Sequence, residues 1–150
     1  MTDIFGKVIS IILVFAMLVV GPLAITMMME EMEDRRSIIN EVSNIVDEVA
    51  DTKSLTEDQL TDFYTGISSY GPIVDAKIEK YVRVINPDPQ NPGSTYTTYM
   101  LSEDTTTWKQ GDIVKVTIKP VGSTKISRFV SKVIGYMLPD FDYTEAGRVR

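Results

Sequence analysis

The sequence predicts an α+β fold in which a long apolar N-terminal helix continues into an amphipathic stalk, followed by a small antiparallel sheet of about three strands packed by helices. Three patterns along the 150 residues indicate this class. Residues 8–29 have no formal charge, residues 38–49 repeat apolar side chains every three or four positions, and residues 73–84 alternate apolar and polar side chains. The first two patterns are typical of helices, and the third is typical of a strand with one buried face.

Residues 8–29 are long enough to cross a membrane. They form 22 consecutive positions without charge, and at about 1.5 Å per residue such a helix spans a hydrocarbon core of about 30 Å. A cleaved signal peptide has a shorter apolar core, of about 7–15 residues, and a small-residue cleavage site that this run lacks. We therefore predict a transmembrane anchor at residues 1–30, with a bend near Gly21-Pro22 because proline lacks a backbone donor.

The charges that flank the apolar run nearly balance, with Lys7 before it and Arg35 and Arg36 after it. Because only six or seven residues precede the run and all of the foldable sequence follows it, the N-terminus is expected inside the cell. The chain is then a single-pass protein of the cell membrane, in which residues 31–150 form an extracytoplasmic α+β stalk and head.

Two amphipathic helices are expected after the anchor. The first continues from it as one rod to about residue 50. Its apolar stripe consists of Ile38, Ile39, Val42, Ile45, Val46 and Val49. The second begins at Thr56, where Gln59 completes a capping-box pattern, and ends at Gly71-Pro72.

Three strands are expected next, in the order of a meander. Lys80 interrupts the apolar face of the first strand and is therefore expected near an edge of the sheet. Residues 86–94 form a proline-rich loop, residues 95–101 the second strand, and residues 114–119 the third. The apolar side chains of the first and third strands are Val74, Ala76, Ile78, Val82, Val84, Val114, Val116 and Ile118. A sheet this small needs the amphipathic helices to cover its apolar face.

The last two segments each leave two alternatives open. Residues 124–138 form an amphipathic helix with Lys125, Arg128 and Lys132 beside its apolar stripe. This helix either packs on the sheet as ordinary core or lies on an anionic membrane surface with its basic residues toward the head groups. The tail of residues 142–150 either adds an edge strand or remains loose.

The charges are unevenly distributed along the chain. Residues 30–62 contain 11 acidic and 3 basic residues, whereas residues 109–150 contain 4 acidic and 8 basic ones. These segments are either two solvated faces of opposite sign or complementary surfaces through which copies of the chain associate. The overall charge of −6 argues against binding to nucleic acid, because neutralising phosphates requires an excess of Lys and Arg.

No catalytic, cofactor-binding or metal-binding residue is predicted, and the chain is expected not to be an enzyme. It has no cysteine and no histidine, which removes thiol nucleophiles and the usual zinc ligands. Residues 111–116 read as a turn that enters a strand, and Asp140 with Asp142 as a solvated turn. Trp108, Tyr96 and Tyr99 either line a ligand patch or pack on the sheet.

One phrase, SLTEDQLTDFYTGISSYGPIVDAKIEKYVRV at residues 54–84, precedes a later GDIVKVTI strand and an AGRVR ending. Together with the N-terminal span, this order resembles the small TadE-like proteins of bacterial tight-adherence pilus systems, in particular those of Gram-positive bacteria. The resemblance implies a pilin-like or pseudopilin protein that acts with other pilus or secretion components, in the membrane or in a filament at the cell surface. Unlike type IV prepilins, the chain has no acidic residue between Lys7 and Glu30. The alternative function is a membrane-anchored binding or regulatory module that does not polymerise.

Overall fold

The computed structural model describes residues 2–71, 73–136 and 141–150. These residues form two compact units. The apolar unit lies within Met1–Arg35 and Ser123–Pro139, and the head unit lies within Arg36–Gly122 and Asp140–Arg150. The long N-terminal helix and a sheet packed with helices confirm the predicted α+β class. The boundary of the anchor at residue 30 stays a prediction, because it depends on where a bilayer ends.

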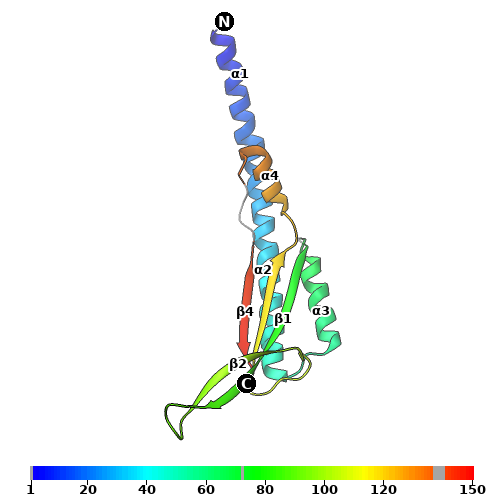
Figure 1. Cartoon of the computed structure of the whole chain (residues 1–150). Helices are drawn as coiled ribbons and strands as arrows, with labels where there is room; N and C mark the ends of the chain where they lie inside the picture. Colours follow the sequence, from blue (N-terminus) through cyan, green and yellow to red (C-terminus); the bar gives the residue numbers. More distant parts are fainter. Residues whose placement is uncertain (1, 72, 137–140) are drawn as a thin grey trace. The chain divides into compact units, whose positions relative to one another are not determined.

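One continuous helical stretch begins at the N-terminal end and reaches into the head unit (Figure 1). It consists of α1 (Thr2–Phe15), the π-helical segment η1 (Ala16–Val20) and α2 (Gly21–Thr52). The Gly21 N–H donates to the carbonyl of Ala16, five residues earlier, which closes the wider π-type turn. Pro22 has no N–H to donate to the preceding turn, so the helix changes its hydrogen-bond pattern at the place where the sequence predicts a bend.

The sheet of the head unit has four antiparallel strands in the order β2-β1-β3-β4. The strands are β1 (Val74–Pro87), β2 (Thr95–Ser102), β3 (Ile113–Pro120) and β4 (Tyr143–Arg148). The tail, which the sequence leaves open between an edge strand and a loose end, is the edge strand β4. The Arg150 N–H donates to the Ala50 carbonyl at 3.1 Å, which fixes the end of the chain to α2.

The core of the head unit lies between α2 and the inner face of the sheet. Its completely buried apolar side chains include Ile38, Val42 and Val49 of α2 with Val114, Val116 and Ile118 of β3. The stripe predicted along α2 is therefore confirmed, with Ile39 half-buried at its margin. Burial of a large apolar side chain contributes about 1.5–3 kcal/mol, so these residues are the main source of the stability of the head.

The helix α3 (Glu57–Ser69) begins as predicted and adds Phe63 and Ile67 to the core. The Thr56 hydroxyl accepts the N–H of Gln59 at 3.3 Å, and the Gln59 side chain accepts the N–H of Thr56 at 2.7 Å. These reciprocal bonds satisfy two backbone donors that the first turn of a helix leaves free. The predicted capping box is therefore confirmed.

The prediction that Lys80 lies near an edge of the sheet is wrong. Lys80 is opposite Val114 of β3 on one side and opposite Ser102 of β2 on the other, so β1 is flanked by both strands at this residue. The side chain points to the inner face and is only 6% exposed. A lysine at such a position needs acceptors close to its ammonium group, which a later loop supplies.

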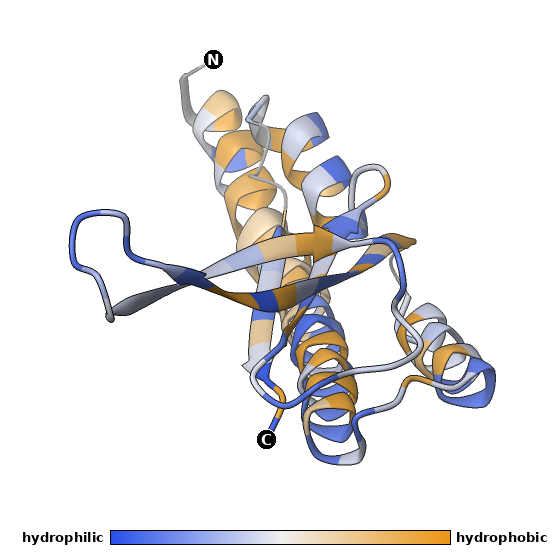
Figure 2. Ribbon diagram, turned by 60° about the horizontal axis from the view of Figure 1, so that its bottom comes forward, coloured by the Kyte–Doolittle hydropathy of each residue, from blue (hydrophilic) through white to orange (hydrophobic). Residues whose placement is uncertain are grey.

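The second half of β1 and most of β2 extend beyond β3 as a two-stranded arm, which Figure 2 shows as a long projecting hairpin. The pairing of β1 with β3 ends at Tyr81, while its pairing with β2 continues to Pro87. Large apolar side chains on the arm are exposed, among them Ile85 at 58% and Met100 at 62%. We call this segment the β1–β2 arm.

The helix α4 (Lys125–Ile134) belongs to the apolar unit. The Thr124 hydroxyl accepts the Ser127 N–H at its start, and Gly135 ends it with a φ of 76°. No described residue of α4 is part of the core cluster of the head unit. Both alternatives for this helix, packing on the sheet and lying on a membrane surface, stay predictions.

Strand β4 passes close to α2 at Gly147, which has no side chain. A Cβ atom added there would lie 2.5 Å from Cγ1 of Val46. Gly147→Ala is therefore expected to lower the free energy of unfolding of the head by about 1–3 kcal/mol, the usual cost of overpacking. The measurement is urea unfolding of the full chain in detergent micelles, followed by circular dichroism.

Val46→Ala is the matched partner variant, because it removes the methyl group that the new Cβ would meet. We expect Val46→Ala and Gly147→Ala together to lower the free energy of unfolding by less than the sum of the two single losses. The difference should be about 1 kcal/mol or more. Strictly additive losses would show that the contact between Gly147 and Val46 does not limit the side chain at residue 147.

Candidate functional surfaces

The apolar N-terminal helix is the largest exposed apolar surface in the described part of the chain. Every residue from Ile4 to Val19 is exposed, with Met17 at 80% and Leu18 at 71%. Of the helices in the described residues, this one alone is long and apolar enough to cross a membrane. A helix of this kind at an N-terminus is consistent with a membrane anchor or with a signal sequence.

Charged residues follow directly after the apolar run within the apolar unit. Glu31 and Arg35 form an ion pair with 2.6 Å between Oε1 and Nη2. Lys125 of α4 lies close enough to Asp34 for its charge to act on that carboxylate. The N-terminal part of α4 therefore lies beside the charged turns of α2, and Figure 1 shows the two helices next to each other.

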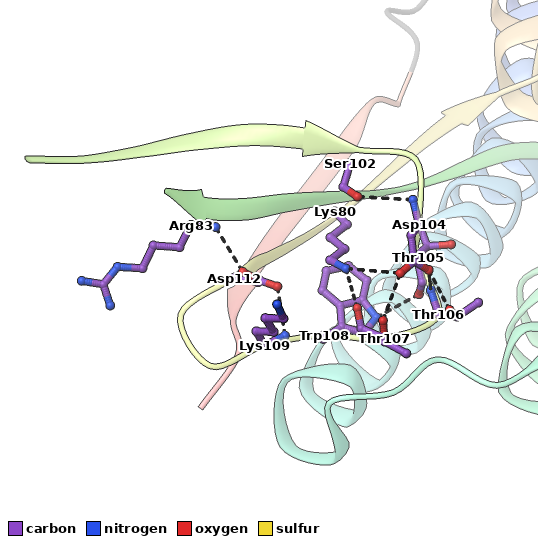
Figure 3. Close-up of polar contacts among 10 residues, drawn as sticks. All are labelled: Lys80, Arg83, Ser102, Asp104, Thr105, Thr106, Thr107, Trp108, Lys109 and Asp112. Carbon is purple, nitrogen blue, oxygen red and sulfur yellow. Dashed lines mark hydrogen bonds and ion pairs between the residues drawn. The ribbon is translucent and has the colours of Figure 1, made fainter. Parts of the chain in front are cut away.

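A polar cluster in the head unit surrounds Lys80 (Figure 3). Its Nζ atom donates to the carbonyl of Thr107 and lies 3.8 Å from Oδ2 of Asp104. It also lies 5.5 Å from the centre of the Trp108 ring. The loop that contains these three partners therefore covers the lysine, and the arrangement is typical of a structural cation.

Asp104 fixes the conformation of this loop by accepting hydrogen bonds from its neighbours. The Thr106 hydroxyl donates to Oδ1 at 2.6 Å and the Thr106 N–H at 2.9 Å, while the Thr107 hydroxyl donates to Oδ2 at 3.0 Å. These bonds, led by the one from the Thr106 hydroxyl, hold the pKa of Asp104 well below its usual range. The carboxylate stays ionised at neutral pH, as its place beside Lys80 requires.

Residues 111–116 form the turn and strand that the sequence predicts. Gly111 has a φ of 95°, in the left-handed region that favours glycine. The next residue, Asp112, is 2% exposed and accepts the N–H groups of Arg83 at 3.1 Å and Lys109 at 2.9 Å. Asp112 thus joins β1 to the loop before β3 (Figure 3), which is a structural task.

The three aromatic residues considered as a ligand patch do not form one. Trp108 is 5% exposed and belongs to the core cluster, and its Nε1 atom donates to the carbonyl of Thr105 at 2.9 Å. Tyr96 and Tyr99 lie on opposite faces of β2, because they are three positions apart in a strand whose side chains alternate between its faces. The alternative of sheet and core packing holds for Trp108.

The described residues contain no group of three or more Asp, Glu, His or Cys side chains that could hold a metal ion. Of the Asp-x-Asp pair, Asp142 is exposed, and Asp140 lies outside the described residues. The sequence missed the cluster around Lys80 and the buried carboxylate of Asp112. A lysine on the apolar side of an alternating strand was the one available signal for the first of these.

Opposite faces of the head unit have charges of opposite sign. Strand pairing places alternate side chains of β1, β3 and β4 on the outer face of the sheet, away from the core. The charged residues of that face are Lys77, Arg83, Lys115, Lys119 and Arg148, with Asp75 and Glu79. The exposed acidic residues of α2 and α3 in the head unit are Asp47, Glu48, Asp51, Glu57, Asp58 and Asp62. The uneven charge along the sequence is thus also a separation between two faces.

Glu79 is the ionised centre of the outer sheet face. Its carboxylate lies 2.7 Å from Nζ of Lys77 and 3.1 Å from Nζ of Lys115. Hydrogen bonds from Lys77 and then Lys115 lower the pKa of Glu79. This effect stabilises the folded head above the usual pKa of 4.5, and it is lost as the pH falls through the lowered folded-state pKa.

Glu79→Gln removes this pH-dependent stabilisation while keeping the shape of the side chain. We expect the variant to melt below the parent chain at pH 7, and the difference between the two melting temperatures to shrink as the pH falls below 4.5. Thermal unfolding followed by circular dichroism at a series of pH values measures this difference. A difference that stays constant down to about pH 3 would contradict the assignment, because the lowered pKa would then have no effect on folding.

The geometry of the described residues thus offers an exposed apolar helix, a basic amphipathic helix, a projecting arm and two oppositely charged faces. Comparisons of the chain with protein-family models, with curated proteins and with solved structures found no match.

Proposed function

We propose that this chain is a structural, non-enzymatic subunit or accessory protein of a bacterial pilus or secretion assembly, anchored in the membrane like a pilin. The observation that supports the proposal best is the continuous helical stretch. Residues 8–19 of this stretch are uncharged and exposed, while residues 38–50 of the same stretch supply the helix on which the head packs. Such a helix needs an apolar environment for its first half and a folded head for its second.

In this role the apolar helix keeps the subunit in the lipid bilayer, with the head outside the cytoplasm. The same surface also suits packing against helices of sister subunits, because helix contacts can replace lipid contacts without exposing apolar groups to water. The partners of the chain are then the bilayer and either copies of itself or other components of the assembly. Such a protein would occur in the cell membrane and, if it polymerises, in a filament at the cell surface.

The charge separation of the head supports association between copies. An acidic face on α2 and α3 and a basic outer sheet face are different surfaces of one head, so contact between them is heterologous, from the front of one copy to the back of the next. Contacts of this kind continue into open filaments when the rotation between copies does not close a ring. Complementary charge also favours the correct orientation of neighbouring copies.

The β1–β2 arm favours a second candidate, a membrane-anchored binding module that does not polymerise. The outer edge of β2 has no neighbouring strand among the described residues, and Met100 and Leu101 near it are exposed. An extended segment of another protein can pair with such an edge. This candidate shares the anchor with the first one and differs in the absence of self-assembly.

Cell fractionation distinguishes the two candidates. Cells that express the tagged full chain are sheared, and the membranes and the sheared surface material are separated and analysed by size and by mass of the N-terminal peptide. Recovery of high-molecular-mass material in the sheared fraction supports the subunit of a filament. Recovery of the intact chain from membranes alone, as a monomer after cross-linking, contradicts polymerisation and favours the binding module.

A further inference from the structure

We infer that α4 binds the anionic head groups of a lipid bilayer, with Arg128 and Lys132 as the residues that contact them. This inference rests on the membrane anchoring in the proposed function and adds a ligand class and a site to it. It does not depend on whether the chain polymerises. Four observations on the apolar unit lead to it.

The first observation is the charge of α4. Described residues 123–136 contain Lys125, Arg128 and Lys132 and no acidic residue. At about 100° per residue, these three positions fall within roughly 60° of one another around the helix. The helix therefore has one basic side, which suits an anionic surface.

The second observation is that two of these cations have no acidic partner among the described residues. The third cation, Lys125, lies close enough to Asp34 of α2 for the two opposite charges to attract each other. No carboxylate in the described parts of the chain forms an ion pair with Arg128 or Lys132, and both side chains are exposed. The acidic turns of α2 thus engage the first cation of α4 and leave the other two for an external anion.

The third observation is that the apolar side of α4 is only partly buried within the apolar unit. Ile126 is 8% exposed, and Phe129 and Val130 are half-buried. Towards the end of the helix, Val133 is 60% exposed and Tyr136 is 61% exposed. An exposed aliphatic residue and an exposed tyrosine beside two cations are typical of a helix that lies at a membrane surface.

The fourth observation is the position of α4 along the apolar helix. The half-buried residues Ala24, Met27 and Glu31 follow one side of α2 at steps of three and four, as expected for a side that another helix covers. Together with the proximity of Lys125 to Asp34, this places α4 next to the end of the uncharged run at Met29. The hydrocarbon core of a bilayer around this helix is expected to end there, so the basic side of α4 lies at head-group level.

Two of the nearby acidic residues are already balanced by cations within the apolar unit. Arg35 neutralises Glu31 through their ion pair at 2.6 Å, and the positive charge of Lys125 attracts the carboxylate of Asp34. Glu30 and Glu33 lie on the exposed part of α2 and repel anionic lipid. The contact with lipid is therefore expected to depend strongly on Arg128 and Lys132, and to weaken as salt screens the charges.

The absence of cysteine allows single spin labels to be placed anywhere in the full chain. We would label Val133→Cys in α4, Ile12→Cys in the apolar helix and Thr65→Cys on the exposed side of α3. Each labelled chain is reconstituted into phosphatidylcholine bilayers with and without phosphatidylglycerol. Accessibility to oxygen, which concentrates in lipid, is then compared with accessibility to a water-soluble nickel complex.

The label at residue 133 is expected to be lipid-protected in anionic bilayers and water-accessible in neutral ones. Arg128→Gln with Lys132→Gln should reduce the ratio of protected to unprotected label in anionic bilayers about 30-fold, since each cation contributes roughly fivefold. Ser127→Gln with Ser131→Gln is the matched control, because it places the same side chains on another side of α4 without removing charge. The label at residue 12 should be lipid-protected in both bilayers, and the label at residue 65 in neither.

Equal accessibility of residue 133 in the two bilayers, or no effect of the double substitution at residues 128 and 132, would overturn the assignment of α4. If residue 12 stays lipid-protected in that case, the anchor stands without the lipid site. Loss of protection at residue 12 as well would overturn the anchor, and the lipid site with it.

Discussion

Trp108→Ala is expected to lower the free energy of unfolding of the head by about 3–5 kcal/mol, the usual cost of removing a buried tryptophan side chain. The ring is 5% exposed and belongs to the core cluster. Small domains are stable by about 5–15 kcal/mol in total, so this loss removes a large part of the stability of the head. Urea unfolding of the full chain in detergent micelles, followed by circular dichroism, measures the effect.

Trp108→Phe is the control that separates packing from the polar role of the indole. Phenylalanine keeps an aromatic face near Lys80 but loses the hydrogen bond from Nε1 to the Thr105 carbonyl, at 2.9 Å. We expect this variant to lose about 1–2 kcal/mol. A loss as large as that of the alanine variant would show that the hydrogen bond, and not the aromatic packing, holds the loop in place.

A double-mutant cycle with Lys80→Met tests whether the ring also shields the ammonium group. Methionine keeps an unbranched apolar chain, and replacing a buried charge by an apolar side chain of similar shape is often nearly neutral. If Trp108 stabilises the cation, Trp108→Ala should cost about 1 kcal/mol less in the Lys80→Met background than in the parent chain. Equal costs in the two backgrounds would contradict an interaction between the ring and Lys80.

Features that depend on neighbouring residues in the sequence were predictable, and the structure confirms them. The capping box between Thr56 and Gln59 needs only two side chains one helical turn apart. The alternation of Val114, Val116 and Ile118 likewise reflects the period of a strand with one buried face. Such local patterns were sufficient for the class of the fold, the first three strands and the helices of the head.

Features that depend on distant contacts were not predictable in the same way. Lys80 looked like an edge residue because it interrupts the apolar face of its strand. Its partners come from the distant loop of Asp104, Thr107 and Trp108. The suggested ligand patch, by contrast, could have been rejected from the sequence, because the period of a strand places Tyr96 and Tyr99 on opposite faces. For α4 the pattern was correct, but an amphipathic helix has the same pattern on a sheet, on another helix or on a membrane.

Replacing Leu13 and Leu18 together by arginine is expected to abolish membrane integration of the chain. Both side chains lie in the uncharged run and are exposed, at 59% and 71%, so the change removes no packing within the described structure. Each arginine near the centre of a spanning helix costs about 2.5–3.5 kcal/mol in membrane insertion. Two of them therefore shift the partition of the helix between lipid and water by several thousandfold or more.

Carbonate extraction of membranes, followed by immunoblotting of the pellet and the supernatant, measures this effect. Leu13→Ala with Leu18→Ala is the matched control, because alanine shortens the same two side chains without adding charge, and this variant should stay in the pellet. Because Leu13 and Leu18 lie outside the head unit, the head of the arginine variant should unfold at the same urea concentration as that of the parent chain. Retention of the arginine variant in the pellet, with its head folded, would mean that the head or α4 holds the chain on the membrane without a spanning helix. The apolar helix would then be free for another task, such as packing in a filament.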